Sequence, residues 1–179
     1  MFFLFRRRLH KKRQEALEFE IKEDYPTVTT QIAIFNELNV AERIINAVVS
    51  LEYPVGKHHI QVVDDSTDET YDIVRALVKE KKLEGIQIEH LHRTHRQGYK
   101  AGALAEAVEK CQTDYVALFD ADFVPHKDYL LKAMPHFQRG QKVGLVQCRW
   151  GHINRNESLI TRVQALGIDG HFAVEQSAR

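Results

Sequence analysis

The residues best suited to chemistry are the two aspartates of the triplet Asp120-Ala121-Asp122, which directly follows the apolar run YVALF. Carboxylates at positions i and i+2 of an extended backbone point the same way. They can therefore share a hard divalent cation, whose remaining ligands would be phosphate oxygens and water. Two unpaired carboxylates at the end of a buried strand would be electrostatically costly without a cation beside them. The triplet predicts a metal site with Asp120 and Asp122 as ligands.

Two other polar clusters also follow runs that are typical of strands. Asn36 and Glu37 come after the first run, and Asp64 and Asp65 come after the second. Ligands of open α/β sheets bind beyond the carboxyl ends of the strands, so these clusters and the triplet are candidates for one site. The alternative for Asp64 and Asp65 is a structural role, in which they cap the following helix together with Asp68.

Positive charge gathers around Gly98. The residues concerned are His92, Arg93, His95, Arg96 and Lys100. Lys100 falls in the first turn of a predicted helix, where free backbone N–H groups and the helix dipole already favour an anion. Together with the acidic clusters, this arrangement describes a site for a nucleoside diphosphate carried by a divalent ion.

Two other kinds of site find less support. His90, His92 and His95 suggest zinc, but only His90 and His92 share a strand face, and no acidic or Cys ligand completes a set. The segment GYKAG is not a P-loop, because the spacing G-x-x-x-x-G-K-[ST] is absent. We therefore predict neither a zinc centre nor a P-loop.

The elements that must position these residues alternate between short β-rich runs and longer helical runs, a pattern typical of βαβ units. The predicted strands are 27–35, 60–63, 86–91, 115–119 and 143–148, and the predicted helices are 38–51, 66–82 (from a capping box of Ser66 and Glu69), 99–110, 128–138 and 158–176. The strand 115–119 is almost wholly apolar, as expected of a central strand buried on both faces. The predicted fold class is α/β, a mostly parallel sheet with helices on both faces.

Length and composition fit one folded domain and exclude several classes of protein. The chain has 179 residues, which is typical of a single domain. Six of its 25 Lys and Arg residues lie in 6–13, which leaves 19 basic residues against 25 acidic ones elsewhere. A nucleic-acid-binding body would instead spread basic charge across a face, so we expect no nucleic-acid partner. Cys111 and Cys148 lack the spacing of a disulfide framework or a zinc ribbon, which favours reduced thiols in the cytosol.

The N-terminal residues 1–24 form a basic leader, in which MFFLF is followed by RRRLHKKR. In a secretory signal the basic region comes first, so this order indicates something else. It is typical of the last turn of a membrane helix followed by its cytoplasmic Lys/Arg cluster. The alternative is a frayed basic terminus. We expect a juxtamembrane leader on an anionic membrane surface, with the domain of residues 25–179 in the cytoplasm.

Five runs, QIAIFNE, IQVVDDSTDET, GYKAGAL, YVALFDADFVP and LVQCRW, resemble family 2 glycosyltransferases in order and spacing. The resemblance is to the membrane-bound cellulose-synthase-like branch, which includes mannan and glucomannan synthases, and it covers about residues 25–176. It implies a Rossmann-like GT-A fold, incomplete at its C-terminus. It also implies inverting transfer of a hexose from a UDP- or GDP-sugar to a hydroxyl of a glycan or lipid, with Mg²⁺ or Mn²⁺ as the cofactor.

The resemblance assigns the nucleoside to residues at the ends of the first two strands. Phe35 and Glu37 would lie against the nucleoside. Asp64 or Asp65 would bind the base and ribose, and the sequence does not decide between these two neighbours.

The same resemblance assigns the diphosphate and the metal. Lys100 would contact the diphosphate, Asp120 would approach the ribose and the metal, and Asp122 would be the direct metal ligand. Family members carry their general base in a later acidic motif, so we expect no catalytic base within this chain and no activity from it alone.

Two competing functions remain open. The chain could be a nucleotide-sugar-binding module without turnover, because the acidic motif is missing from it. A sugar-phosphate nucleotidyltransferase is favoured less, since it would need a glycine-rich, basic loop after the first strand, and FNELN is neither.

Overall fold

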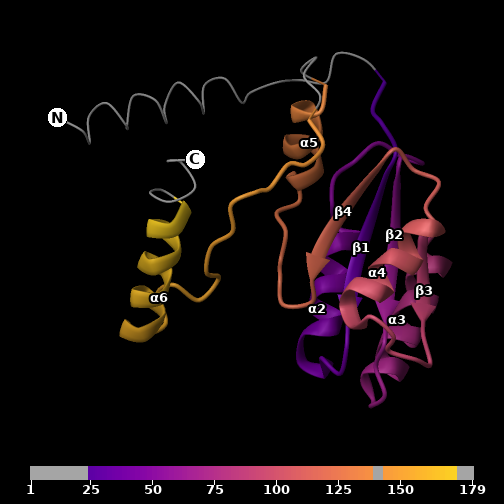
Figure 1. The fold of residues 1–179 in the computed structure, drawn as a ribbon, viewed down its shortest axis with the longest axis horizontal. Helices are drawn as coiled ribbons and strands as arrows, with labels where there is room; N and C mark the ends of the chain where they lie inside the picture. The colour runs from indigo at the N-terminus through magenta and orange to yellow at the C-terminus, as the bar shows by residue number, and fades with distance from the viewer. Residues whose placement is uncertain (1–23, 139–142, 173–179) are drawn as a thin grey trace. The chain divides into compact units, whose positions relative to one another are not determined.

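Four short strands form a parallel sheet in the first part of the chain, and helices connect these strands (Figure 1). The computed structural model describes residues 24–138 and 143–172. These ranges belong to two compact units that divide between Gln141 and Lys142. The elements are β1 (Val28–Ile34), α2 (Leu38–Val49), β2 (His58–Asp64), α3 (Thr70–Leu83), β3 (Ile88–His92), α4 (Tyr99–Glu109), β4 (Tyr115–Asp120), α5 (Tyr129–Ala133), a 3₁₀ turn (Met134–His136) and α6 (Leu159–Gly170).

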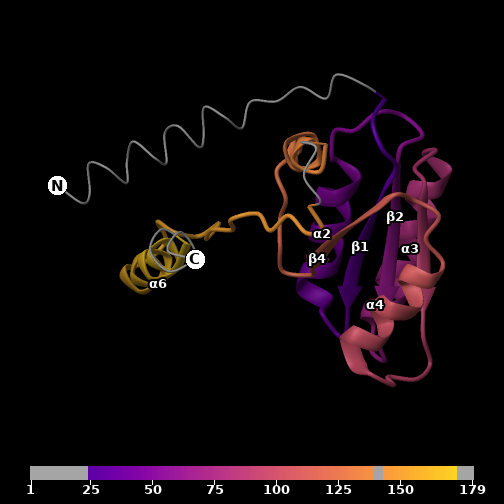
Figure 2. The same cartoon turned by 45° about the horizontal axis from the view of Figure 1, so that its top comes forward.

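The sheet has the order β3-β2-β1-β4, and all neighbouring strands are parallel. Helices α2 and α3 cover one face and α4 covers the other (Figure 2). Right-handed crossovers require this arrangement when the chain proceeds from β1 to β3 and then returns to the far side of β1. The prediction of a parallel α/β sheet with helices on both faces is confirmed.

The register of the strands brings their carboxyl ends together. Ile34 of β1 lies opposite Asp64 of β2, and Asp64 lies opposite His92 of β3. On the other side of β1, Ala33 lies opposite Asp120 of β4. The polar clusters that follow the strands therefore meet at one edge of the sheet.

The core beneath this edge is made by the central strands and the helix α2. The i, i+3, i+4, i+7 stripe of α2 is fully buried, and its members are Ala41, Ile44, Ile45 and Val48. Ile32 of β1 and Val62 of β2 are also fully buried. Burial of each of the Ile and Val side chains among them contributes about 1.5–3 kcal/mol, which stabilises the frame of the site.

The prediction that 115–119 is a central strand buried on both faces is wrong for the described residues. In the sheet formed by the described residues, strand β4 lies at an edge and pairs with β1 alone. Val116 is 37% exposed and Leu118 is 56% exposed. An apolar run shows that a strand can be buried, whereas its actual burial depends on the layers that cover it.

The prediction of a strand over 143–148 is also wrong. The segment has no regular structure, and Leu145 is 81% exposed. A strand exists only through hydrogen bonds to a neighbouring strand, and among the described residues this segment forms no such ladder.

The C-terminal unit contains α6, whose start is well defined. Ser158 Oγ accepts a hydrogen bond from the Thr161 backbone N–H at 3.1 Å, and the Ser158 backbone N–H donates to Thr161 Oγ1 at 3.0 Å. This capping box ends the preceding loop. Asp169 pairs with Arg149, and with Arg155 at 3.0 Å, which ties the loop to the helix.

Part of the predicted membrane leader lies outside the described residues, namely 1–23. Within the described ranges, no helix has the length and apolar character needed to cross a membrane.

Candidate functional site

A cavity of about 110 Å³ opens at the edge of the sheet where the strands end. Four of the predicted site residues line it, and they are Phe35, Glu37, Asp65 and Lys100. The other lining residues are Ala33, Ile34, Val63, Arg96 and Ala103. An apolar wall with a few convergent polar groups is typical of sites for small organic ligands.

Arg96 covers the ring of Phe35. Its guanidinium carbon lies 3.3 Å from the Phe35 ring centroid and 5.3 Å from that of Tyr99. A planar cation on an aromatic face is a favourable stacking arrangement. The sequence indicated Arg96 only as one of several basic residues near Gly98, and its contact with Phe35 was not predicted, because the two residues lie on different loops.

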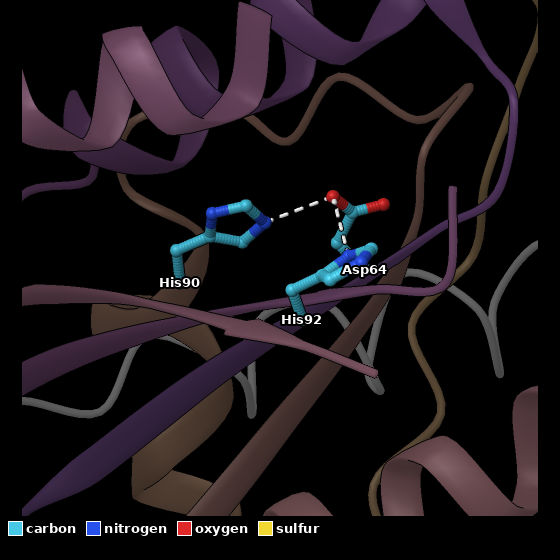
Figure 3. A group of neighbouring side chains, drawn as sticks. All are labelled: Asp64, His90 and His92. Atoms are coloured by element: carbon cyan, nitrogen blue, oxygen red, sulfur yellow. Dashed lines mark hydrogen bonds and ion pairs between the residues drawn. The ribbon is translucent and has the colours of Figure 1, made fainter. Parts of the chain in front are cut away.

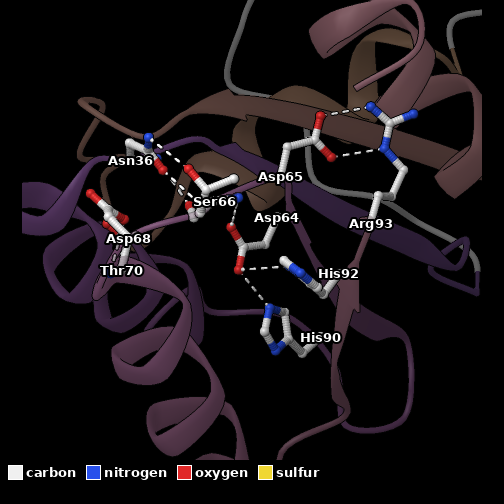
Figure 4. Close-up of polar contacts among 10 residues, drawn as sticks. Asn36, Asp64, Asp65, Ser66, Asp68, Thr70, His90, His92 and Arg93 are labelled. Atoms are coloured by element: carbon white, nitrogen blue, oxygen red, sulfur yellow. Dashed lines mark hydrogen bonds and ion pairs between the residues drawn. The ribbon is translucent and has the colours of Figure 1, made fainter. Parts of the chain in front are cut away.

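Asn36 fastens the loop after β1 to the loop after β2. Its backbone N–H donates to Ser66 Oγ at 2.9 Å, and its side-chain Oδ1 accepts from the Thr67 N–H at 2.9 Å (Figure 4). Asn36 has a φ of 52°, a left-handed conformation that Asn tolerates better than most residues. This turn holds Phe35 and Glu37 at the cavity.

The predicted capping box of Ser66 and Glu69 is wrong. Ser66 Oγ is taken by Asn36, and Glu69 makes no side-chain capping bond. Instead, Asp68 Oδ1 accepts a hydrogen bond from the Thr70 N–H at 3.0 Å at the start of α3. The spacing of a capping box could not reveal that a distant loop would compete for the serine.

Asp64 and Asp65 point in different directions, because consecutive residues at a strand end face opposite sides of the sheet (Figure 4). Asp65 lines the cavity and forms a bidentate pair with Arg93, with Nε–Oδ1 at 2.8 Å and Nη2–Oδ2 at 2.6 Å. Asp64 is fully buried, and its Oδ1 accepts from the Ser66 N–H at 2.8 Å. Of the two aspartates, the geometry therefore brings Asp65 to the cavity.

The surroundings of Asp64 keep it ionised. Burial alone would raise the pKa of its carboxyl, but hydrogen bonds from His90 and Ser66 outweigh burial and lower the pKa below its ordinary value. His90 Nε2 lies 2.8 Å from Asp64 Oδ2, and His92 Nδ1 lies 3.6 Å from the same oxygen.

The three side chains Asp64, His90 and His92 form a cluster whose ligand atoms all lie within 4.8 Å of one another (Figure 3). The prediction that no acidic ligand accompanies the histidines is therefore wrong. Asp64 comes from the neighbouring strand, 26 residues before His90, so their proximity depends on the pairing of β2 with β3.

Arg93 organises the loop before α4. Its side chain is only 7% exposed and also donates to Glu106 Oε1 at 2.6 Å and to the carbonyl oxygen of Tyr99 at 3.1 Å. The hydrogen bonds with Asp65 are the largest cause of the raised pKa of this guanidinium. A permanently charged group thus holds Asp65 and the start of α4 together.

Lys100 lies among carboxylates on the open side of the cavity. It donates to Asp120 Oδ1, and both side chains are about half exposed. Burial raises the pKa of Glu37, the charge of Asp122 raises it further, and Lys100 opposes both. Asp122 thus carries its charge close enough to Glu37 to affect it, and carboxylate oxygens such as those of Asp122 are ligands that hard cations of the Mg²⁺ and Mn²⁺ class prefer.

Comparison with known sequences identifies the family. Residues 30–173 match the family model described as Glycosyl transferase family 2. The chain is 40% identical over 183 residues to "Probable glucomannan 4-beta-mannosyltransferase 1" of Arabidopsis thaliana, covering 98% of this chain and 33% of that protein. It is 44% identical over 156 residues to "Glucomannan 4-beta-mannosyltransferase 9" of the same plant, covering 85% and 29%. The chain thus spans about a third of the length of these curated relatives.

Comparison with solved structures identifies the fold. A mannosyltransferase from Pyrobaculum calidifontis, in complex with GDP-Man and Mn²⁺, superposes with a TM-score of 0.55 at 26% identity, covering 73% of this chain and 39% of that one. Glucosyl-3-phosphoglycerate synthase from Mycobacterium tuberculosis gives a TM-score of 0.52 at 20% identity, covering 83% and 53%. The predicted GT-A fold is confirmed. By sequence and by fold, the chain belongs to glycosyl transferase family 2.

Proposed function

We propose that this chain carries the donor-binding half of an inverting hexosyltransferase, which binds a nucleotide sugar with the help of Mg²⁺ or Mn²⁺. The observation that carries the proposal is the cavity lined by Phe35, Glu37, Asp65 and Lys100 at the carboxyl edge of the sheet. Ligands of open α/β sheets bind at this edge.

The nucleoside would occupy the apolar part of the cavity. Phe35 offers a ring face on which a base can stack, and Arg96, which now covers that ring, would stack on the other side of the base or move aside. Asp65 would accept hydrogen bonds from the base or ribose, in an orientation fixed by Arg93. We propose no contact between Asp64 and the nucleoside, because Asp64 is fully buried against β3.

The diphosphate would lie between Lys100 and the carboxylates of Asp120 and Asp122. When bound by these two aspartates, the divalent ion would neutralise the charge that develops on the leaving diphosphate. Lys100 would turn from Asp120 to the phosphates and add a second positive charge. Asp122 would bind the metal directly, and Asp120 would bind it while approaching the ribose.

The relatives favour a particular donor. The similar plant proteins are named as mannosyltransferases, and the solved relative at 26% identity contains GDP-Man. We therefore propose GDP-mannose as the donor, with a UDP-sugar as the alternative.

Transfer itself would need an acceptor and a base. The acceptor hydroxyl of a glycan or lipid would form a bond to the anomeric carbon from the side opposite the diphosphate. The diphosphate would leave with the electrons of the broken C–O bond. Because the new bond forms on the opposite side of the anomeric carbon, the configuration there would be inverted. We propose no catalytic base among the residues of this chain, because the family's acidic motif, whose carboxylate would take the hydroxyl proton, is missing from them.

The role of Lys100 tests this proposal. In Lys100→Ala, GDP should bind about one to two decades more weakly, since a charge-assisted contact contributes about 1.5–3 kcal/mol, while guanosine should bind almost unchanged. Calorimetric titration in Mn²⁺ measures both affinities. Lys110→Ala, an exposed lysine just after α4, is the matched control and should change neither. Equal weakening of GDP and guanosine by Lys100→Ala would show that the lysine only supports the fold.

A further inference from the structure

We propose that Asp64, His90 and His92 form a second metal site, which takes a first-row transition-metal ion of the zinc class. The site lies on the opposite side of the β2 end from the Asp65 cavity, and it does not depend on the proposed function. Its donors are Asp64 Oδ2, His90 Nε2 and His92 Nδ1 (Figure 3).

The backbone presets the three donors. His90 and His92 are two residues apart on β3, so both side chains leave the same face of the sheet. Asp64 ends β2 and lies directly opposite His92 in the register. The ring of Tyr71 packs on both imidazoles, with centroid distances of 5.5 Å to His90 and 4.5 Å to His92. The two imidazoles are therefore held side by side before any ion binds.

A simple hydrogen-bond network explains only part of this cluster. His90 and the Ser66 N–H already satisfy one oxygen each of the Asp64 carboxylate. His92 Nδ1 is aimed at the oxygen already used by His90, at 3.6 Å, which is too long for a hydrogen bond. Two ligands of a tetrahedral ion with bonds of about 2.0–2.1 Å lie roughly 3.3 Å apart. The distance of 3.6 Å between His92 Nδ1 and Asp64 Oδ2 is close to that value. The distance of 2.8 Å between His90 Nε2 and Asp64 Oδ2 is shorter, and it would lengthen when an ion replaces the proton that these two atoms share.

The chemistry of the donors selects the ion. Two imidazoles and one carboxylate suit Zn²⁺, Co²⁺ or Ni²⁺, whereas Mg²⁺ and Ca²⁺ prefer all-oxygen sites. Three protein ligands leave a fourth position for water or another ligand.

An ion can reach the cluster from solvent. The side chain of Asp64 is 0% exposed, that of His90 12% and that of His92 28%, so the cluster is closed at the aspartate and open at His92. A cleft of about 500 Å³ lies on the open side, and its lining residues are Ser66, Thr67, Asp68, Glu69, Tyr71, Asp72 and His92. Three of these carry carboxylates, which attract cations.

A bound ion would join the end of β2 to β3 directly behind Asp65. It would therefore stabilise the frame of the cavity without entering it. Its effect should appear as a higher unfolding temperature in the presence of the ion.

Titration of the untagged chain of residues 1–179 with Co²⁺ tests the site, with Mg²⁺ in excess to occupy hard-oxygen sites. We expect one ion per chain, the visible absorption bands of four-coordinate Co²⁺, displacement of these bands by Zn²⁺, and a raised unfolding temperature. His92→Ala, which changes the most exposed ligand, should weaken binding by more than the roughly 10- to 100-fold that changes outside the ligand set cause.

Two controls make the result decisive. His95→Ala removes an exposed histidine of the next loop, and Asp122→Ala removes one proposed ligand of the other metal site, which Mg²⁺ occupies in this titration, so neither should change the Co²⁺ bands. Absence of the Co²⁺ bands, bands that persist in His92→Ala, or bands that disappear in Asp122→Ala would each overturn the proposal. His90→Ala provides a second test wherever circular dichroism shows that it folds.

Discussion

At the scale of single residues, His58 links the stability of the fold to pH. Its Nε2 lies 2.8 Å from Thr30 Oγ1, and burial, together with the neighbouring His59, lowers the pKa of His58 from 6.5 to about 4. The unfolded chain therefore takes up a proton near pH 6.5, whereas the folded chain stays neutral at this residue until about pH 4. The contribution of neutral His58 to the free energy of unfolding is therefore present above pH 6.5 and is lost as the pH falls from 6.5 to about 4.

The variant His58→Gln isolates this effect. Between pH 7 and pH 5, the wild-type free energy of unfolding should fall by up to about 2 kcal/mol more than that of the variant, because glutamine can bond to Thr30 but does not titrate here. Urea unfolding of both proteins at the two pH values measures the difference. Parallel pH profiles would show that His58 has an ordinary pKa.

The sequence predicted the types of residue at the site better than their orientations. Glu37 and Lys100 were recognisable because one follows a predicted strand and the other lies in the first turn of a predicted helix, whereas Phe35 was indicated only by the resemblance to family 2 glycosyltransferases. The choice between Asp64 and Asp65 was not, since it depends on the residue at which β2 ends, and β2 extends one residue beyond the predicted strand. The approach of His90 to Asp64 also depends on strand pairing, which local sequence does not specify.

At the scale of elements, the start of α4 is built around two glycines. Gly98 precedes the helix with a φ of 72°, and Tyr99 follows with a φ of 49°. A Cβ on Gly102 would lie 2.1 Å from the carbonyl oxygen of Gln97. Because Gly102 has no Cβ, the turn at Gln97 can pack directly on the helix, and Lys100 then lines the cavity. Both glycines therefore support the proposed contact of Lys100 with the diphosphate.

Alanine at Gly102 should therefore destabilise the fold, although alanine normally favours a helix. We expect Gly102→Ala to lose about 1–3 kcal/mol, the range typical of an overpacked site, and to weaken GDP binding because Lys100 moves. Thermal unfolding followed by circular dichroism measures the first effect. Gly167→Ala is the matched control in α6, where a Cβ meets nothing within 4 Å, and it should not lower stability. Equal behaviour of the two variants would contradict the close packing of Gln97 on Gly102.

The sequence predicted the first four strands and the helices between them because their periodicities are local. Helix α2, for example, ends within two residues of its predicted end. The position of β4 in the sheet and the absence of a strand at 143–148 were not predictable in this way. Both depend on which segments lie alongside, and an apolar run is the same at an edge as in the centre.

At the scale of the whole molecule, the basic leader and the acidic body should behave differently toward membranes. Each Lys or Arg near an anionic surface contributes about 1 kcal/mol, and six of them lie in residues 6–13. We expect the chain to sediment with phosphatidylserine vesicles at low salt and to be released at high salt, where the charges are screened. Substitution of the six residues by glutamine should abolish sedimentation. Equal sedimentation with uncharged vesicles would contradict an electrostatic leader.

We propose that this chain binds a nucleotide sugar through a divalent ion held by Asp120 and Asp122. Calorimetric titration with GDP-mannose, with Mn²⁺ and then with EDTA, tests it most directly. A donor diphosphate and the two aspartates carry the same sign of charge, so binding should need the ion. Asp122→Ala should remove the Mn²⁺-dependent part, whereas Asp128→Ala, which breaks an exposed pair with Lys132, should leave it unchanged. Binding of GDP-mannose that is equally strong in EDTA, or that survives Asp122→Ala, would show that the donor does not bind through an ion held by Asp122.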